Sequence, residues 1–280
     1  MSNQRTVVVT GANSGFGRFT VEAFAADGWR VYATMRNLAT RNAQPAEELR
    51  RAGINVVELD VTDDASVEAA AATILGEAGA VDVLVNNAGN GYFGTLEAFT
   101  PKAVEQQYAT NVIGPLRVNR AFLPSMRERK SGLVIYVSSV VGRLVIPGGG
   151  VYGSSKWALE ALAETAAYEL APFGIDVAIV EPGAFATDIF GKVVKPDDVA
   201  RVEAYGEFAE DRSAAIAASA EGRDPKDVAV AILHLANAPA GTRELRTVVP
   251  GNPAVVAIND AVGAIQQQAM GSPRPLAAQR

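Results

Sequence analysis

Residues 6–17 read Thr6-Val7-Val8-Val9-Thr10-Gly11-Ala12-Asn13-Ser14-Gly15-Phe16-Gly17. The unbroken apolar run at the start is typical of a strand that is buried on both faces of a parallel sheet. The glycines then permit a tight turn and a close approach of the backbone, and a helical pattern with apolar positions at Phe16, Val21 and Phe24 follows. A helix N-terminus presents unpaired N–H groups and a partial positive charge. This strand, turn and helix therefore predict a binding site for a dinucleotide pyrophosphate.

The alternation of strand and helix continues along the chain. Short apolar runs predict seven strands, at residues 6–9, 30–34, 55–59, 81–85, 133–137, 175–180 and 247–249. Helical patterns separate them, at residues 15–27, 46–51, 65–77, 102–129, 152–171 and 226–235. Because parallel strands need crossover connections, this order predicts an α/β chain of the Rossmann type: a doubly wound sheet of about seven parallel strands with helices on both faces.

One domain is expected over residues 1–270, with two departures from the alternation. Residues 184–224 form a long insertion with several aromatic side chains, and insertions of this length are usually functional, so we expect a substrate lid there. Residues 253–270 predict one added helix. Residues 271–280 contain two prolines and no apolar pattern, which predicts a frayed tail.

Composition excludes several classes of site. The chain has 280 residues, no cysteine and a single histidine, His234, so disulfides, thiolate sites and multi-histidine metal centres are ruled out, and no metal is expected. The net charge of −6 argues against a nucleic-acid partner. No apolar run is long enough for a membrane span and no signal peptide is evident, so we expect a cytoplasmic protein.

Tyr152 and Lys156 are the strongest candidates for catalysis. A separation of four residues puts both side chains on one face of the predicted helix. A phenol titrates near pH 10, so acid–base work near neutrality needs a drop of roughly three pH units. An ammonium about 4 Å away in a medium of effective dielectric about 20 supplies an interaction of that size. We therefore expect Lys156 to lower the pKa of Tyr152.

Further motifs follow in a consistent order. Gly11, Gly15 and Gly17 fit T-G-x-x-x-G-x-G, and Asn86-Asn87-Ala88-Gly89 follows the fourth predicted strand. With the Tyr152/Lys156 pair, these motifs resemble the short-chain dehydrogenase/reductase family over about residues 5–250. The resemblance implies a dehydrogenase or reductase that uses NAD(P) and acts on CH–OH or C=O groups.

The same resemblance assigns the catalytic set. It implies Asn111, Ser139, Tyr152 and Lys156, with Asn111 at a helix distortion that holds a proton-relaying water. Ser139 is preferred because it lies 13 residues before Tyr152, as in several family members, and Ser138 is the alternative. For Asn111 the alternative is an ordinary amide on a helix surface.

The glycine loop and the resemblance together predict the residues that contact the nucleotide. They are Gly11, Asn13, Ser14, Gly15, Phe16, Gly17, Arg36, Asp60, Val61, Asn87, Ala88, Gly89, Tyr152, Lys156, Pro182, Gly183 and Thr187. Residues 28–44 contain no carboxylate, and Arg36 follows the second predicted strand, where a guanidinium can bind a 2′-phosphate. NADP(H) is therefore favoured over NAD(H), and the alternative is that Arg36 is a solvated loop charge.

The predicted substrate pocket is mostly apolar. Its members are Tyr92, Phe93, Leu144, Val145, Phe185 and Phe190. A neutral lipophilic ketone or secondary alcohol suits such a lining. Similarity to the branch that contains 17β-hydroxysteroid and retinol dehydrogenases implies a steroid-like or aromatic substrate. Family members commonly pair through two long helices, here residues 102–129 and 152–171, which implies a homodimer or homotetramer.

Two other functions compete with this one. A catalytically silent dinucleotide sensor would keep the glycine loop, but it need not keep Ser139, Tyr152 and Lys156 together. A sugar-nucleotide epimerase or dehydratase of the extended branch would usually carry G-x-x-G-x-x-G and a longer C-terminal domain. Neither feature is present in this sequence.

Overall fold

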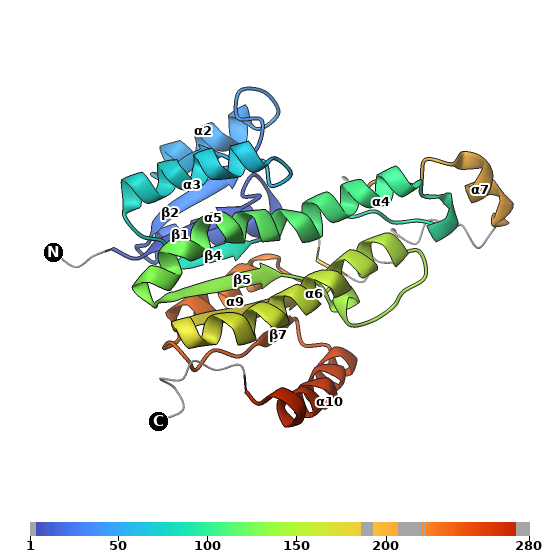
Figure 1. Cartoon of the computed structure of the whole chain (residues 1–280). Coiled ribbons are helices and arrows are strands. Elements are labelled where there is room, and N and C mark those ends of the chain that lie inside the picture. The colour runs from blue at the N-terminus through green and yellow to red at the C-terminus, as the bar shows by residue number, and fades with distance from the viewer. Residues whose placement is uncertain (1–3, 186–192, 207–219, 221, 273–280) are drawn as a thin grey trace.

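A parallel sheet of seven strands runs through the computed structural model, which describes residues 4–185, 193–206, 220 and 222–272 (Figure 1). Its strands lie in the order β3-β2-β1-β4-β5-β6-β7. The strands are β1 (Thr6–Thr10), β2 (Arg30–Met35), β3 (Asn55–Glu58), β4 (Val83–Asn86), β5 (Gly132–Val137), β6 (Ile175–Pro182) and β7 (Arg246–Val249). The order reverses between β1 and β4, and ligands bind at such a point in open α/β sheets. The predicted doubly wound sheet is confirmed.

Helices cover both faces of the sheet. α1 (Gly15–Ala26), α2 (Ala43–Arg51) and α9 (Lys226–Asn237) pack on one face, and α3 (Asp64–Ala78), α5 (Gly114–Arg129) and α6 (Gly150–Leu170) pack on the other. Successive strand residues point to opposite faces, so Val7 and Val9 belong to the first core and Val8 to the second. Both cores need apolar partners, which explains why the strands are unbroken apolar runs rather than alternating ones.

The predicted helix over residues 102–129 is interrupted by a π-helical turn. α4 (Pro101–Tyr108) begins after Thr100, whose hydroxyl accepts a hydrogen bond from the N–H of Ala103. The turn occupies Ala109–Ile113, and α5 continues beyond it. Figure 1 shows α4 and α5 as one long rod that extends past the sheet. A π turn inserts an extra residue and often marks a functional site, and here it contains the buried Asn111.

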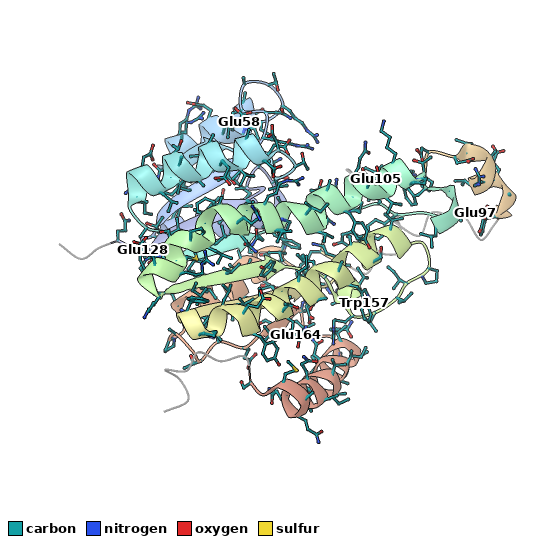
Figure 2. All side chains as sticks on the ribbon, viewed as in Figure 1. Glu58, Glu97, Glu105, Glu128, Trp157 and Glu164 are labelled. Carbon is teal, nitrogen blue, oxygen red and sulfur yellow. The ribbon has the colours of Figure 1, made fainter. Side chains whose placement is uncertain are left out.

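The described part of the predicted lid packs against residues 92–100. Val194 forms a parallel bridge with Tyr92, and the Asp197 carboxylate accepts hydrogen bonds from the N–H and hydroxyl of Thr100. Helix α7 (Val199–Ala204) is followed by Tyr205, whose hydroxyl donates to Glu97 at 2.8 Å. Figure 2 shows Glu97 beside α7. The predicted site residues Thr187 and Phe190 lie outside the described residues.

The C-terminal helix α10 (Pro253–Met270) has the predicted bounds and lies beside β7 (Figure 1). It begins at Asn252, whose side chain caps it by accepting from the N–H groups of Ala254 and Val255. Most of the predicted tail, residues 273–280, lies outside the described part of the chain. Among the described helices, none combines the length and the apolar character that crossing a membrane requires.

Candidate active site

A cleft of about 340 Å³ opens where the glycine loop, the end of β4 and the start of α6 meet. Most of the residues predicted to bind the nucleotide line it. They are Gly11, Asn13, Ser14, Gly15, Phe16, Arg36, Asp60, Val61, Asn87, Ala88, Gly89, Tyr152 and Lys156. The cleft therefore joins the predicted phosphate loop to the predicted catalytic pair, although these segments are far apart in sequence.

The glycine loop is packed too closely for side chains. Gly11 has φ +68°, and a Cβ there would lie 2.8 Å from the Cα of Ala88. A Cβ on Gly17 would lie 2.4 Å from the carbonyl oxygen of Gly11 and 2.5 Å from Asn87 Nδ2. Gly17 is thus buried behind the loop rather than lining the cleft. With α1 starting at Gly15, this backbone fits the diphosphate of a dinucleotide.

The end of β4 is tied to the glycine loop by hydrogen bonds. The Thr10 hydroxyl accepts from the N–H groups of Asn87 and Ala88, both at 3.0 Å. Asn87 Nδ2 in turn donates to the carbonyl oxygens of Thr10 at 2.8 Å and Gly11 at 3.2 Å. These bonds fix the width of the cleft between β1 and β4.

Arg36 and Asp60, both predicted to contact the nucleotide, line the cleft and lie beside each other. Arg36 Nη1 lies 3.5 Å from Asp60 Oδ2, and the Arg36 side chain is half-exposed. Burial would raise the pKa of Asp60, but hydrogen bonds from Thr62 and the charge of Arg36 outweigh it and lower that pKa. Arg41, which follows Arg36 in the same carboxylate-free stretch, and Asn42 also line the cleft. No feature of the sequence indicated Asn42 or the pairing of Arg36 with Asp60.

Three of the predicted catalytic side chains lie close together. Tyr152 is buried in the first turn of α6, and its phenol is hydrogen-bonded to Ser139. Lys156 lies one turn further on, 5.7 Å from the centre of the Tyr152 ring, and its Nζ donates to the carbonyl oxygen of Val137 at 2.8 Å. The alternative residue, Ser138, lines the cleft whereas Ser139 does not, but the Ser138 hydroxyl is buried and has no hydrogen-bond partner among the described residues.

The protonation expected for Tyr152 is corrected by this geometry. Burial raises the pKa of Tyr152 to about 12, and the hydrogen bond from Ser139 offsets only part of that rise. Burial likewise lowers the pKa of Lys156 to about 8, although the charge of Glu160 acts in the opposite direction. The ammonium is hydrogen-bonded to a carbonyl of β5, and the phenolate would be desolvated. Tyr152 therefore holds its proton at neutral pH and is a proton donor.

Asn111 lies behind the cleft wall rather than in it. Its Nδ2 donates to the carbonyl oxygen of Asn90 at 3.0 Å and to the Ser155 hydroxyl at 3.1 Å, and its Oδ1 accepts from the N–H of Asn90 at 3.1 Å. The residue is buried, unlike the surface amide of the alternative interpretation. Pro182 and Gly183 end β6 beside Ser139, whose hydroxyl approaches the carbonyl oxygen of Pro182 at 3.4 Å.

The predicted pocket residues occupy different environments. The Phe93 ring lies 5.0 Å from the Tyr152 ring, measured between centroids. Tyr92 is buried in a small core with Phe99, and Phe185 is buried with its ring edge-on to Phe16. Leu144 is half-buried, and Val145 is 86% exposed. Within the described part of the predicted pocket, Phe93 is the residue whose ring packs against the candidate catalytic group.

Comparison with known proteins assigns the family. The short chain dehydrogenase model matches residues 5–198. A 3-ketodihydrosphingosine reductase from Bacteroides thetaiotaomicron is 40% identical over 181 residues, which are 65% of this chain and 64% of the relative. The 17-beta-hydroxysteroid dehydrogenase type 1 of Mus musculus is 41% identical over 197 residues, which are 67% of this chain and 56% of the relative. The matches thus span less than two thirds of either relative.

Solved structures agree over more of the chain. A short-chain dehydrogenase from Streptomyces avermitilis matches with a TM-score of 0.80 and 36% identity, over 96% of each chain. An alcohol dehydrogenase from Thermococcus sibiricus, solved with 5-hydroxy-NADP, has a TM-score of 0.70 and 28% identity over 89% of this chain and 99% of its own. A short-chain dehydrogenase/reductase from Burkholderia phymatum, solved with NAD, has a TM-score of 0.75 and 28% identity over 95% of each chain. This chain therefore belongs to the short-chain dehydrogenase family.

Proposed function

We propose that this chain is an NADP(H)-dependent oxidoreductase that interconverts a lipophilic ketone and the corresponding secondary alcohol. The observation that carries the proposal is a single cleft lined by the glycine loop, Tyr152 and Lys156, with Ser139 hydrogen-bonded to the Tyr152 phenol. A bound nicotinamide would supply or accept the hydride. The relatives named above, a 3-ketodihydrosphingosine reductase and a 17-beta-hydroxysteroid dehydrogenase, support the ketone and alcohol assignment.

The protein side chains have separate roles in this proposal. Tyr152 donates a proton to the carbonyl oxygen during reduction, and its raised pKa keeps the phenol protonated at neutral pH before the reaction. Ser139 donates a second hydrogen bond to the same oxygen and polarises the carbonyl. Lys156 lies beside the Tyr152 ring with its ammonium held by the Val137 carbonyl, and in the proposal its charge would offset only part of the cost of burying the phenolate. Asn111 acts from behind the cleft wall through Asn90 and Ser155.

Replacing Tyr152 by phenylalanine tests the proton donor. We expect Tyr152→Phe to lower kcat at least ~100-fold, because only the phenolic hydroxyl is removed from a preformed site. The dissociation constant for NADPH, measured by fluorescence titration, should change little, since the glycine loop is untouched. Tyr168→Phe is the matched control, because Tyr168 lies on the same helix and its hydroxyl bonds to the carbonyl oxygen of Gly271. Near-normal turnover by Tyr152→Phe would exclude the assigned role.

Arg36 is the residue that we propose selects NADP(H). It lines the cleft with Arg41, and a guanidinium can bind a 2′-phosphate through two hydrogen bonds. Arg36→Asp would place a second carboxylate beside Asp60, so we expect the ratio of kcat/KM for NADPH over NADH to fall by about tenfold or more. Arg51→Asp, on an exposed face away from the cleft, is the control. An unchanged ratio would contradict the charge argument.

The substrate class is proposed from the surroundings of Tyr152. Phe93 packs against its ring, and an aromatic wall beside the reacting carbonyl suits a flat, apolar substrate. A panel of steroid, aromatic and long-chain ketones, followed at the nicotinamide absorbance with each cofactor, tests this class. Nucleotide binding without turnover of any ketone or alcohol would instead support the dinucleotide sensor.

A further inference from the structure

A buried glutamine lies behind the candidate site and takes no part in the catalytic set. Gln107, in the last turn of α4, is completely buried. Its Nε2 donates two hydrogen bonds to one residue, Asn90: 3.0 Å to the main-chain carbonyl oxygen and 2.8 Å to the side-chain Oδ1. Both hydrogens of the Gln107 amide are therefore committed to the loop that follows β4.

Asn90 connects this glutamine to the cleft. It lines the cleft directly after Gly89, and both its N–H and its carbonyl oxygen are hydrogen-bonded to the side chain of Asn111. Asn90 is thus held from one side by Gln107 and from the other by Asn111. We call these three side chains the amide clamp.

The amide clamp adjoins the proposed proton-transfer group. A Cβ on Gly89 would lie 3.3 Å from Asn111 Oδ1 and 3.8 Å from Lys156 Nζ, so both groups border the same glycine. Gln107 and Asn111 are four residues apart and span the start of the π turn. The π turn brings Asn111 inward, and the bonds of Gln107 to Asn90 fix the partner that Asn111 meets there.

Packing alone does not explain a glutamine at this position. Its Oε1 is buried and has no hydrogen-bond partner among the described residues. An unsatisfied buried acceptor destabilises the folded state, and an apolar side chain of similar length would avoid that loss. The feature that an apolar side chain cannot reproduce is the pair of hydrogen bonds to Asn90.

We propose that Gln107 is a positioning residue, which holds Asn90 and thereby orients Asn111 beside Lys156. Its effect on turnover rests on the proposed function. The clamp itself is a property of the protein alone, so it can be tested separately.

Amide hydrogen exchange measures the clamp without any substrate. The N–H of Asn90 donates to Asn111 Oδ1, so it is protected only while the clamp is intact. In Gln107→Met, which keeps length but removes both donors, we expect this amide to exchange at least ~10-fold faster. The exchange of Val85, within β4, should be unchanged. Glu105→Gln, at a neighbouring exposed position of α4, is the control and should leave both amides as in the wild type.

Kinetics then test the consequence of the clamp for the reaction. For Gln107→Met we expect kcat to fall about tenfold, with less than a threefold change in KM or in the dissociation constant of NADPH, because the glycine loop is intact. Gln107→Glu adds a pH signature. A protonated carboxyl can still donate to Asn90, whereas an ionised one faces two acceptor oxygens. The kcat of Gln107→Glu relative to wild type should therefore fall as the pH rises.

The possible results separate the two proposals. Unchanged exchange of the Asn90 amide in folded Gln107→Met would overturn the clamp, whatever the kinetics. Faster exchange with wild-type kcat and no pH signature would overturn the positioning role and leave a structural one. If the wild type turns over no ketone or alcohol, the proposed function fails, and the exchange experiment still decides whether Gln107 holds Asn90. If Gln107→Met does not fold, exchange of the Asn90 amide in Gln107→Glu, compared with wild type at low and at high pH, decides instead whether residue 107 holds Asn90.

Discussion

Lys156 shows how a single buried residue links the site to the stability of the molecule. Burial lowers its pKa to about 8, against an ordinary value of 10.5. Between these values the unfolded chain binds a proton that the folded chain does not. Stability therefore increases with pH across this window, since it rises wherever the unfolded state holds more protons. The buried ammonium thus costs stability at neutral pH, and the proposed catalytic role is the reason to retain it.

Lys156→Met makes this cost measurable. From pH 8 to pH 10, we expect the free energy of unfolding of the wild type to rise relative to this variant by on the order of 2 kcal/mol. Tyr152 does not obscure the change, because its pKa is raised from 10 to about 12 and its own window begins above pH 10. Urea unfolding at several pH values gives the difference. Lys102→Met, at an exposed position on α4, is the control, and a pH-independent difference for Lys156→Met would contradict the assignment.

The sequence correctly predicted that Tyr152 and Lys156 lie side by side. It did not correctly predict the pKa of Tyr152. Tyr152 and Lys156 share a helix face because of a local spacing, which the sequence displays. Their burial depends on packing by Phe93 and on the carbonyl of Val137, from other segments of the chain. Gln107 was missed although it precedes Asn111 by four residues, the same spacing that identified the Tyr152/Lys156 pair. Its partner, Asn90, is distant in sequence, so the spacing alone gave no reason to select it.

At the scale of elements, a buried network joins α6, β6, β7 and α10. Arg246 on β7 bonds to Glu160 at 3.0 Å and to Glu164 at 2.7 Å, both on α6, and lies 3.6 Å from Glu181 on β6. Asn259 on α10 donates to Glu181 at 2.6 Å and accepts from Arg143 at 2.8 Å. Burial raises the pKa of Glu181 to about 7; the charge of Glu160 also raises it, while Asn259, Arg246 and Arg143 lower it.

Glu181→Gln tests the protonation of this network. The folded pKa of Glu181 is above its ordinary value of 4.5, so the folded chain keeps a proton that the unfolded chain loses. The stability associated with that proton is fully present below pH 4.5 and is lost as the pH rises towards 7. We expect the free energy of unfolding of wild type relative to Glu181→Gln to fall by on the order of 2 kcal/mol over this window.

The control for that experiment is an exposed glutamate. Glu105 lies on the outer side of α4 (Figure 2) and is exposed to solvent. Glu105→Gln should show the same pH dependence as the wild type. Parallel stability curves for wild type and Glu181→Gln would mean that Glu181 is ionised in the folded protein throughout the window.

The first and last residues of a helix or strand could be predicted from the sequence where local residues determine them. The strands and α10 follow from apolar runs and a capping residue, and they agree with the structure within two residues at either end. The spacing of apolar residues over 102–129 did not predict the π turn, because one inserted residue hardly changes an apolar pattern that extends over 28 positions. Its place came from the family resemblance at Asn111 instead.

At the scale of the whole molecule, the reversal of strand order places the cleft. Helices leave the sheet in opposite directions from β1 and β4, and the crevice between them opens at the carboxyl ends of the strands. The alternation of strands and helices with right-handed crossovers predicted a doubly wound sheet, but it did not give the strand order that places the reversal between β1 and β4. The packing of residues 193–206 against residues 92–100 was not predictable in the same way, because it depends on single contacts such as Thr100 with Asp197.

Nucleotide binding should therefore stabilise the entire fold, because the cleft is built from loops of several strands. At a nucleotide concentration 100 times the dissociation constant, the gain is about 2.7 kcal/mol, which raises Tm by roughly 5 °C for a domain of this size. Gly11→Ala should lower Tm and abolish the gain, since its Cβ would meet the Ala88 backbone at φ +68°. Gly76→Ala, where a Cβ meets no atom within 4 Å, is the control and should keep the rise in Tm on nucleotide binding.

Differential scanning calorimetry with NADP+ and with NAD+ measures the Tm of each variant with and without nucleotide. Equal gains for Gly11→Ala and wild type would place the nucleotide elsewhere on the molecule.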